Sequence, residues 1–404
     1  MTALHFITPS VYPYPGGMQE SVLRIARGMA ACGFECFIYT LGSSDPQRET
    51  GAVPAGVEIV PVGEDLDFLL DPLVGGRTFP PEGEENRAVV QCLTNAVRER
   101  QRTGRDGADL IISFYASHSG FLAQHAAMSL GLPHIASVRG SDFARDVLET
   151  SQHWRMRFVV EHADQLVTTN QEQAEGLYAM FSLRRRARTI HNSIEDPAER
   201  PYWECPDIDR IRLFSDCGFS LKKGTHLLLR AVESLVEKGL PVELTVLGGV
   251  FRTESEEYWE GCRRDYLTRH PDRFAFPGHR PRAEVSDYLR KSHLYCSATF
   301  AEGCSLSRIR ALTVGIPIVT TRSGALVEVV DGCDHVRLCS PGDWKGLARE
   351  IEKAVADLGN KALIPDRRRI DGWRSHFSVD RERKKWLSVV EGVLPTPAPV
   401  SEGS

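Results

Sequence analysis

The sequence lacks the features of several large protein classes. It has no run of about 20 consecutive apolar residues such as a membrane-spanning helix requires. Met1 to Thr8 predict a short apolar strand running into Pro9, without the basic stretch and long apolar region of a signal peptide. The 49 basic and 54 acidic residues leave a net charge of −5, which provides no overall attraction for nucleic acid or an anionic membrane. These features predict a cytoplasmic protein that does not bind nucleic acid.

Paired cysteines are also absent. The ten cysteines are scattered, with no CxxC pair and no spacing typical of metal ligands. We therefore expect mostly buried thiols in a reducing compartment. Because no metal-binding Asp-x-Asp loop is recognisable either, we expect neither a metal nor another cofactor.

The length and composition predict an ordinary globular protein with two domains. At about 150 residues per domain, a chain of 404 residues is too long for one hydrophobic core. Hydrophobic residues make up 42% of the chain and charged residues 25%, as in typical globular proteins. A loop rich in proline and charge, Glu195 to Asp209, is the linker candidate. It separates a domain over residues 1–195 from a second over 196–377, and residues 395–404 predict a disordered tail.

Strands and helices alternate in both halves. The first strand, Leu4 to Thr8, is followed by a loop rich in Pro and Gly, an amphipathic helix from Gln19 to Cys32, and a strand from Glu35 to Thr40. The pattern recurs with Leu110 to Phe114, Gly120 to Leu130, Ile135 to Val138 and Leu166 to Thr169 in the first half, and with Ile211 to Ser215, Thr225 to Lys238, Val242 to Gly248, Phe274 to Phe276, Glu284 to Lys291, Leu294 to Ser297, Leu306 to Val314 and Ile316 to Thr320 in the second. This alternation predicts two doubly wound parallel sheets of the α/β class. Ligands bind at the carboxyl ends of such strands, so we expect one site in the cleft between two facing domains.

One segment carries most of the functional information. Ala301 to Gly315 reads AEGCSLSRIRALTVG and is followed by IPIVTTRSGALVEVVDG, and shorter motifs accompany it in order: Gly16-Gly17, KKG at 222–224, LGG at 247–249 and FPGH at 276–279. Together these motifs resemble the GT-B glycosyltransferases of the retaining family GT4 over nearly the whole chain. The resemblance implies two Rossmann-like domains, the first on the acceptor side and the second on the nucleotide-sugar donor side. It also implies that a helix over residues 378–394 packs back on the first domain.

The family's donor leaves as a nucleoside diphosphate, so its developing negative charge must be met by cations and backbone N–H groups. Lys223, just before a predicted helix, is the leading diphosphate ligand, and the N-terminal amides of the next motif helix, at Ser305, Leu306 and Ser307, assist it. Gly16 and Gly17 let the backbone approach a ligand closely, although a simple turn explains them equally well.

Glu302 matches the first glutamate of the family's pair of glutamates. The resemblance implies that it contacts the donor sugar near the reacting carbon and stabilises positive charge there, with Gly303 and Cys304 beside it as sugar-binding residues.

Two positions depart from the family pattern. The second glutamate, which should accept the ribose hydroxyls, is Arg310, and a guanidinium only donates hydrogen bonds. The family's arginine before the KKG motif is missing, because Phe214 to Leu221 reads FSDCGFSL. Arg310 could bind the diphosphate in place of that arginine, recognise an altered donor, mark lost donor binding, or simply face solvent.

Three further candidates lie in the first half. His118, in the ASHSG run, stands at the end of a strand where relatives often carry a histidine facing the sugar or acceptor, although a core histidine is an alternative. In VRGSDF, Arg139 stands where many relatives have histidine, and we expect Arg139 and Asp142 to bind acceptor or sugar unless Ser141 and Asp142 cap a helix.

The leading hypothesis is therefore a retaining glycosyltransferase that uses a nucleotide-diphosphate sugar and an unidentified acceptor. Alternatives are a pseudo-glycosyltransferase with an altered donor and a catalytically silent scaffold subunit. A homo-oligomer or a partner subunit is compatible with each hypothesis.

Overall fold

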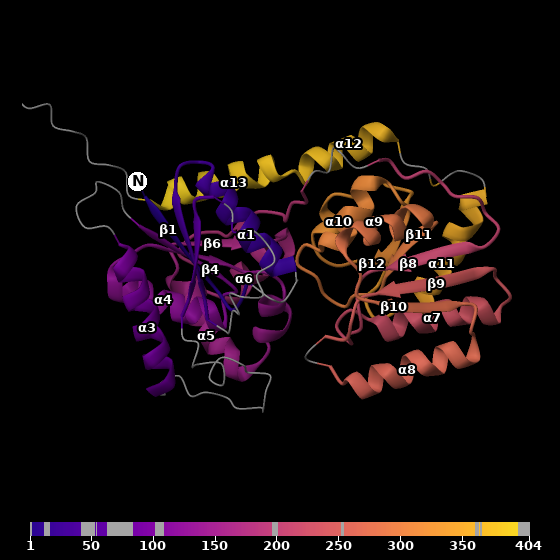
Figure 1. Ribbon diagram of the computed structural model, residues 1–404, viewed down its shortest axis with the longest axis horizontal. Helices are drawn as coiled ribbons and strands as arrows, with labels where there is room; N and C mark the ends of the chain where they lie inside the picture. Colours follow the sequence, from indigo (N-terminus) through magenta and orange to yellow (C-terminus); the bar gives the residue numbers. More distant parts are fainter. Residues whose placement is uncertain are drawn as a thin grey trace, which may run out of the picture. The chain divides into compact units, whose positions relative to one another are not determined.

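The chain folds into two compact units. The computed structural model describes residues 2–11, 17–41, 53, 55–62, 84–101, 109–195, 201–251, 254–359, 363 and 366–394. One unit combines Met1–Ser193 with Val379–Ser404, and the other comprises Ile194–Ser378 (Figure 1). The change of unit thus falls close to the predicted boundary after residue 195, while the predicted tail and Gly16 lie outside the described residues. None of the described helices has the length and apolar character needed to cross a membrane.

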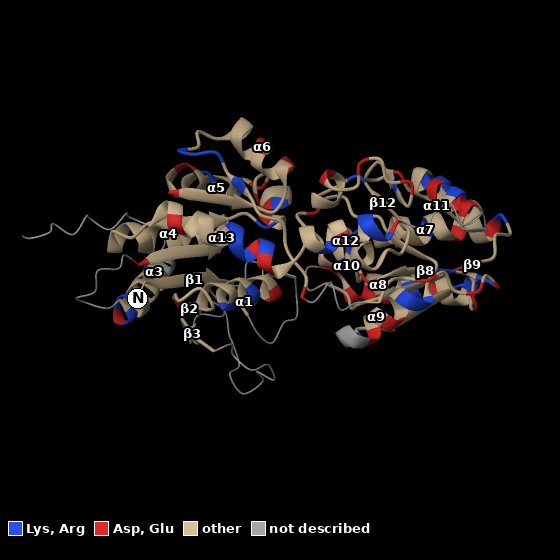
Figure 2. Cartoon of the chain, turned by 90° about the horizontal axis from the view of Figure 1, so that it is seen from above, with Lys and Arg blue, Asp and Glu red and all other residues tan. Residues whose placement is uncertain are grey.

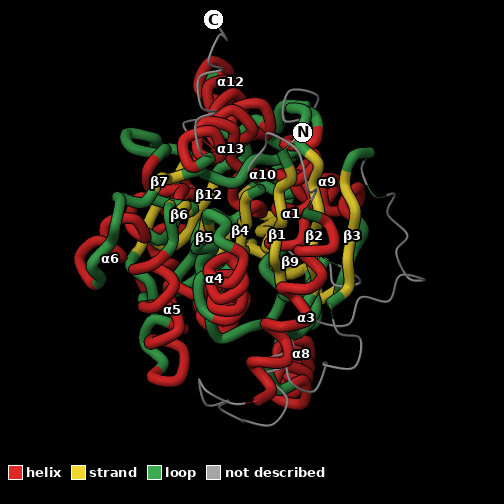
Figure 3. Tube along the Cα trace, turned by 90° about the vertical axis from the view of Figure 1, so that its left-hand side faces the viewer, coloured by secondary structure: helices red, strands yellow, loops and turns green. Residues whose placement is uncertain are grey.

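The described strands of the first unit form a seven-stranded parallel sheet in the order β3-β2-β1-β4-β5-β6-β7, which Figure 3 shows across its width. These strands are β1 (Ala3–Thr8), β2 (Glu35–Thr40), β3 (Val57–Pro61), β4 (Leu110–Phe114), β5 (His134–Ser137), β6 (Gln165–Thr168) and β7 (Arg188–Thr189). The helices are α1 (Gly17–Ala30), α3 (Glu84–Arg100), α4 (His118–Leu130), the π-helix η3 (Asp142–Asp146), α5 (Thr150–His162), α6 (Gln171–Met180) and α13 (Val379–Val393).

Two hydrophobic cores sandwich this sheet, because successive side chains of a strand point to opposite faces. Leu4 and Phe6 of β1 pack into the core formed with α1 and α13, whereas Ile7 packs into the core formed with α3, α4 and α5. All six residues of β1 are buried, as expected of a parallel strand that is covered on both faces.

Helix α13 belongs to the first unit although it follows the second in sequence. The fully buried Trp386 stacks on Phe114 of β4, with ring centroids 6.2 Å apart. On the same helix, Glu382 accepts hydrogen bonds from Arg24 Nε of α1, at 2.7 Å, and from the Ser193 hydroxyl, at 2.5 Å. A stacked aromatic pair and a buried ion pair therefore hold α13 in this unit.

The described strands of the second unit form a six-stranded parallel sheet in the order β10-β9-β8-β11-β12-β13. They are β8 (Ile211–Ser215), β9 (Val242–Leu247), β10 (Phe274–Gly278), β11 (Leu294–Ser297), β12 (Ile318–Thr321) and β13 (Val336–Cys339). The helices are α7 (Thr225–Glu237), α8 (Glu256–Arg269), α9 (Arg282–Lys291), α10 (Leu306–Val314), the 3-10 helix η4 (Ala325–Glu328), α11 (Trp344–Gly359) and α12 (Arg367–His376). Helices α7 and α11 pack together on one face of the sheet, and α10 and α12 pack together on the other (Figure 1).

Much of the predicted linker is part of the second unit. The indole Nε1 of Trp203 donates to the Ser292 carbonyl at 2.8 Å, and its backbone N–H donates to the Val314 carbonyl at 2.7 Å. The buried Trp203 ring joins the hydrophobic core of this unit. Trp203 therefore anchors this segment on the second unit.

Each sheet has one point at which the direction of winding reverses. In the first unit it lies between the neighbouring strands β1 and β4, and in the second between β8 and β11. Ligands of doubly wound sheets bind at the carboxyl ends of the strands at these switch points. The predicted α/β class, with two doubly wound parallel sheets, is confirmed.

Candidate functional site

The switch point of the second unit carries a short ion pair. Lys223 lies in the loop between β8 and α7, and Glu302 lies in the loop between β11 and α10. Lys223 Nζ is 2.5 Å from Glu302 Oε1, and the two side chains are 21% and 12% exposed. Two residues that are 79 positions apart in sequence thus meet at the edge where this fold class binds ligands.

Glycines allow these loops to pack closely. Gly224 has a φ of 64°, and a Cβ built there would lie 2.1 Å from the carbonyl oxygen of Ala298. Gly324, with a φ of 71°, lies against the Glu302 loop, and a Cβ there would lie 2.9 Å from Glu302 Cβ. Both positions need glycine, since other residues rarely adopt positive φ and no space exists for a side chain. The loops after β8, β11 and β12 therefore form one packed edge.

A second cation lies within this edge. Arg308 of α10 is 1% exposed, and its Nε donates to Ser297 Oγ at 3.2 Å. Its Nη1 donates to the Ser323 carbonyl at 2.8 Å and hydroxyl at 3.0 Å, and its Nη2 donates to Thr321 Oγ1 at 3.2 Å. Arg308 thus ties the carboxyl ends of β11 and β12 together.

The local electrostatics favour a charged pair. Burial acts to raise the pKa of Glu302, but the positive charges of Lys223 and Arg308 outweigh it and lower the pKa below its ordinary value. Burial acts to lower the pKa of Lys223, but Glu302 raises it overall. Both groups are therefore ionised at neutral pH. Figure 2 shows basic and acidic residues mixed over both units, so this cluster of positive charge is a local feature.

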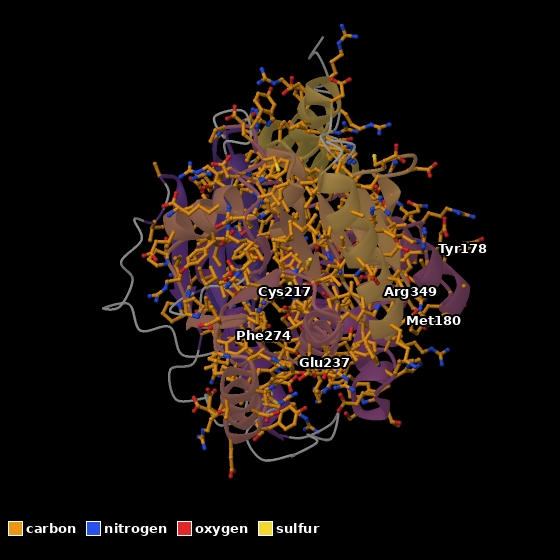
Figure 4. The ribbon with its side chains drawn as sticks, turned by 90° about the vertical axis from the view of Figure 1, so that its right-hand side faces the viewer. Tyr178, Met180, Cys217, Glu237, Phe274 and Arg349 are labelled. Atoms are coloured by element: carbon orange, nitrogen blue, oxygen red, sulfur yellow. The ribbon has the colours of Figure 1, made fainter. Side chains whose placement is uncertain are left out.

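The cysteine of the loop after β8 is not a reactive thiol. Cys217, labelled in Figure 4, lies in the loop after β8, and burial raises the pKa of its thiol. A neutral thiol is a poor nucleophile. All ten cysteines are free, and six of them are buried, which fits the predicted mostly buried thiols.

Helix α10 begins where the motif predicts. Ser305 is its N-cap, with its hydroxyl oxygen accepting from the Arg308 backbone N–H at 3.5 Å. Leu306 is buried in the core and Ser307 is half-buried, whereas Gly303 and Cys304 are buried in the loop beside Glu302. The expected sugar-binding and amide-bearing residues therefore follow Glu302 directly in sequence, in its loop and in the first turn of α10.

The half-buried Arg310 follows Arg308 by two residues on α10. Residues in an α-helix are about 100° apart, so the two arginines leave α10 on nearly opposite sides. Because Glu302 lies before the helix rather than on it, an eight-residue spacing does not place Glu302 and Arg310 on one helical face. Whether Arg310 binds phosphate stays a prediction.

The switch point of the first unit has a different chemistry. His118 is the first residue of α4, after β4, and its Nδ1 is 3.2 Å from Arg155 Nη1. Burial and the neighbouring Arg155 charge lower the pKa of His118 to about 4, so its ring is neutral at pH 7. Arginine only donates, so Nδ1 accepts and the ring proton is on Nε2. Among the described residues, the buried Nε2 has no hydrogen-bond partner.

Asp142 holds the loop that carries His118. Its carboxylate accepts backbone N–H bonds from Ala116 at 3.0 Å, Arg139 at 2.9 Å, Gly140 at 2.8 Å and Phe143 at 3.1 Å. The buried Asp142 side chain thus makes its hydrogen bonds within the protein and holds two loops together.

Arg139 donates from Nη2 to Asn192 Oδ1 at 2.6 Å, and its guanidinium lies 5.2 Å from the centroid of the Phe114 ring. Gly17 is the first residue of α1, after β1, on the same edge of the sheet. His118, Arg139 and Gly17 therefore belong to the carboxyl-end edge of the first sheet.

Four residues of these sites were not predicted from sequence: Arg308, Arg155, Asp146 and Tyr115. Asp146 accepts from the Ser117 hydroxyl at 2.6 Å, and Tyr115 has a φ of 72°, which is unusual for a residue with a side chain. In the sequence, Arg308 stands out as a charged residue among apolar positions of a predicted helix, whereas no sequence feature marks Tyr115.

Comparisons with known proteins agree with this architecture. Residues 16–193 match the glycosyl transferase 4-like domain, and residues 216–357 match glycosyl transferases group 1. The capsular polysaccharide biosynthesis glycosyltransferase CapM of Staphylococcus aureus is 29% identical over 146 residues, a match that covers 35% of this chain and 36% of CapM.

Two solved structures share the fold over nearly the whole chain. Sucrose-phosphate synthase of Thermosynechococcus elongatus has a TM-score of 0.76 at 15% identity, covering 97% of this chain and 99% of its own. HepE of Anabaena, solved in complex with UDP, has a TM-score of 0.73 at 16% identity, covering 97% and 100%.

The two doubly wound sheets and these neighbours define a GT-B protein. With a matched family domain over each unit, the chain belongs to the group 1 glycosyltransferases, family GT4, and the predicted resemblance is confirmed.

Proposed function

We propose that this glycosyltransferase moves a sugar from a nucleotide-diphosphate sugar to an acceptor, with retention of the anomeric configuration and without a metal or other cofactor. The observation that carries the proposal is the Lys223–Glu302 pair at the switch point of the second sheet. The solved complex of HepE with UDP supports a nucleotide donor. The free thiols of all ten cysteines fit a reducing compartment, so the cytoplasm remains the proposed location.

In this proposal, Lys223 and Glu302 act on different parts of the donor. Lys223 binds the donor diphosphate and stabilises it as the bond to the anomeric carbon breaks, because negative charge develops on the departing oxygen. Glu302 contacts the sugar and stabilises the positive charge that develops at that carbon. The two groups are 2.5 Å apart, so each compensates the charge of the other.

The proposal assigns His118 a hydrogen-bond donor role. Its Nδ1 is occupied by Arg155, and a pKa of about 4 makes the ring too weak a base to accept a proton efficiently near neutral pH. Its Nε2–H suits a hydroxyl of the sugar or the acceptor.

An altered donor is the second candidate, and Arg310 favours it. A guanidinium cannot accept hydrogen bonds from ribose hydroxyls, whereas it binds an additional phosphate well. A pseudo-glycosyltransferase with such a donor would keep Lys223 and change the recognition of the nucleoside.

A panel of nucleotide sugars tests both candidates. We expect at least one member to raise the melting temperature by mass action and to support transfer, with NMR of the product showing the anomeric configuration of the donor. Lys223→Ala should strongly reduce the shift, while Lys238→Ala should retain it, because Lys238 pairs with Glu352 on an exposed surface. Binding without transfer to any acceptor would favour the scaffold reading, and no binding by the whole panel would contradict the proposed function.

A further inference from the structure

Arg308 is an unusual residue for the interior of a sheet protein. Its guanidinium is almost completely buried, and its four hydrogen bonds go to hydroxyl and carbonyl oxygens. Within the part of the chain that the structure describes, no carboxylate forms an ion pair with it. Its direct hydrogen bonds thus go to neutral acceptors, and the nearby carboxylate whose charge it stabilises is Glu302.

Such an arrangement is costly for stability alone. Removing a charged group from water costs several kcal/mol, and apolar side chains of similar volume often replace buried charges with a gain in stability. Hydrogen bonds to neutral oxygens offset part of that cost. The burial of Arg308 therefore points to a use for its positive charge.

The contacts of Arg308 lead directly to Glu302. Arg308 Nη1 holds the carbonyl of Ser323, and the next residue, Gly324, packs against the backbone of the Glu302 loop. The following backbone N–H, from Ala325, donates to the Gly303 carbonyl at 2.9 Å. The loop after β12, held by Arg308, thus packs directly against the loop that carries Glu302.

A second contact path reaches the same loop. Thr321 Oγ1 accepts from Arg308 Nη2 and donates to the Thr299 carbonyl at 2.5 Å. Thr299 lies between β11 and Glu302. Arg308 therefore positions the Glu302 loop from two sides.

We propose that Arg308 is a positioning residue for the diphosphate site, where it supplies the positive charge that the sequence lacks before Lys222–Gly224. The inference rests on the proposed function. When a diphosphate draws Lys223 away from Glu302, the positive charge of Arg308 still compensates the negative charge of the Glu302 carboxylate. Without Arg308, Lys223 would be shared between two anions, and the diphosphate would lose part of its attraction.

Calorimetric titration with inorganic pyrophosphate tests this role without requiring a nucleoside, a sugar or turnover. We expect Arg308→Met to weaken pyrophosphate binding by at least about tenfold, because Glu302 loses a compensating charge and competes with the anion for Lys223. Arg308→Lys keeps the charge and loses most of the hydrogen bonds, so it should recover most of the affinity.

Arg374→Met is the matched control. Arg374 is also a buried arginine of the second unit, with Nε donating to the Thr313 carbonyl at 2.8 Å, but it lies on α12. We expect this variant to lower the melting temperature while pyrophosphate affinity stays unchanged.

Unchanged pyrophosphate affinity in folded Arg308→Met would show that Arg308 is only structural and would overturn the inference, while leaving the proposed function intact. If Arg308→Met does not fold, Arg308→Lys decides: affinity within about threefold of the parent supports the charge role, and a greater loss in the folded protein overturns it. Failure of the unaltered protein to bind pyrophosphate would contradict the inference and the proposed donor site together.

Discussion

The switch points of the two sheets have the same topology but opposite chemistry. In the second unit, loops after β8, β11 and β12 bring together Lys223, Glu302 and Arg308, all charged. In the first unit, the loop after β4 presents His118, which burial and Arg155 keep neutral, on a frame held by Asp142.

The comparison suggests how work is divided in a two-unit transferase. A diphosphate is the same anion in every nucleotide sugar, and in the proposed function a fixed cluster of charge binds it. Acceptors vary, and a neutral hydrogen-bond donor on a rigid loop is compatible with many hydroxyl groups. The units also differ in chain continuity, because only the first needs a distant helix, α13, to complete its core.

The largest predicted effect concerns α13, the distant helix that completes the core of the first unit. Trp386→Ala should destabilise the first unit by about 3–5 kcal/mol, because the buried ring is lost from its contact with Phe114. Scanning calorimetry should show a lower melting transition for that unit alone. Trp259→Ala, at a buried tryptophan of the second unit, is the control and should lower the other transition. Equal effects of both changes on both transitions would show that the units unfold as one.

The charged switch point predicts the next effect. Lys223→Ala should weaken donor binding by about 1.5–3 kcal/mol, the value of a charge-assisted hydrogen bond, and leave folding intact. Isothermal titration with the donor found in the panel measures this. Donor affinity and activity that both stay unchanged would remove Lys223 from the site.

Arg310 gives a smaller expected effect because its side chain is half-buried and partly screened by solvent. If it replaces the missing cation, Arg310→Ala should reduce donor affinity by about 1.5 kcal/mol, and Arg310→Glu by more, because a carboxylate would face phosphate. Improved binding of an ordinary nucleotide sugar by Arg310→Glu would instead show that the arginine changes specificity at the ribose.

The effect that is smallest near neutral pH concerns the acid stability of the first unit. Burial lowers the pKa of His134 to about 3, with Nδ1 bonded to Gln124 at 2.8 Å and Nε2 to Ser113 at 2.9 Å. The unfolded chain, with an ordinary pKa near 6.5, binds the proton more readily, so stability is lost as pH falls from about 6.5 toward 3, by up to about 1.4 kcal/mol per pH unit. His134→Gln should flatten this slope in denaturant titrations of the first unit, and a slope equal to that of the parent would contradict the assignment.

Much of the fold was predictable because buried parallel strands are continuous apolar runs. The predicted strands Glu35 to Thr40 and Leu294 to Ser297 and the helix Leu306 to Val314 match the structure residue for residue. The edge strand β3 was missed, since only one of its five residues is buried and its sequence carries no long apolar run. Helix α8 was missed for a similar reason, because most of its surface is polar and its one buried residue is Trp259.

The candidate site was predictable where a motif sets the local backbone. Lys223 and Glu302 each stand directly before a glycine in a loop that follows a strand, and both lie at the switch point. Their direct contact was not predictable, because it depends on two loops packing through Gly224 and Gly324. Arg310 stands out in the sequence because it replaces the second glutamate of the family pair, whereas the role of Arg308 depends on the packing of α10 against the ends of β11 and β12.

The place of α13 has a consequence for how the molecule is made. A ribosome delivers the chain from its N-terminus, so the sheet of the first unit emerges before any other part. Its Phe114 nevertheless lacks the Trp386 partner until the whole second unit has been synthesised. The second unit is continuous and can fold as soon as it emerges, while the first keeps an apolar face open to water. The unit that is translated first is therefore finished last, and during that interval it is the part of the nascent chain that most needs a chaperone.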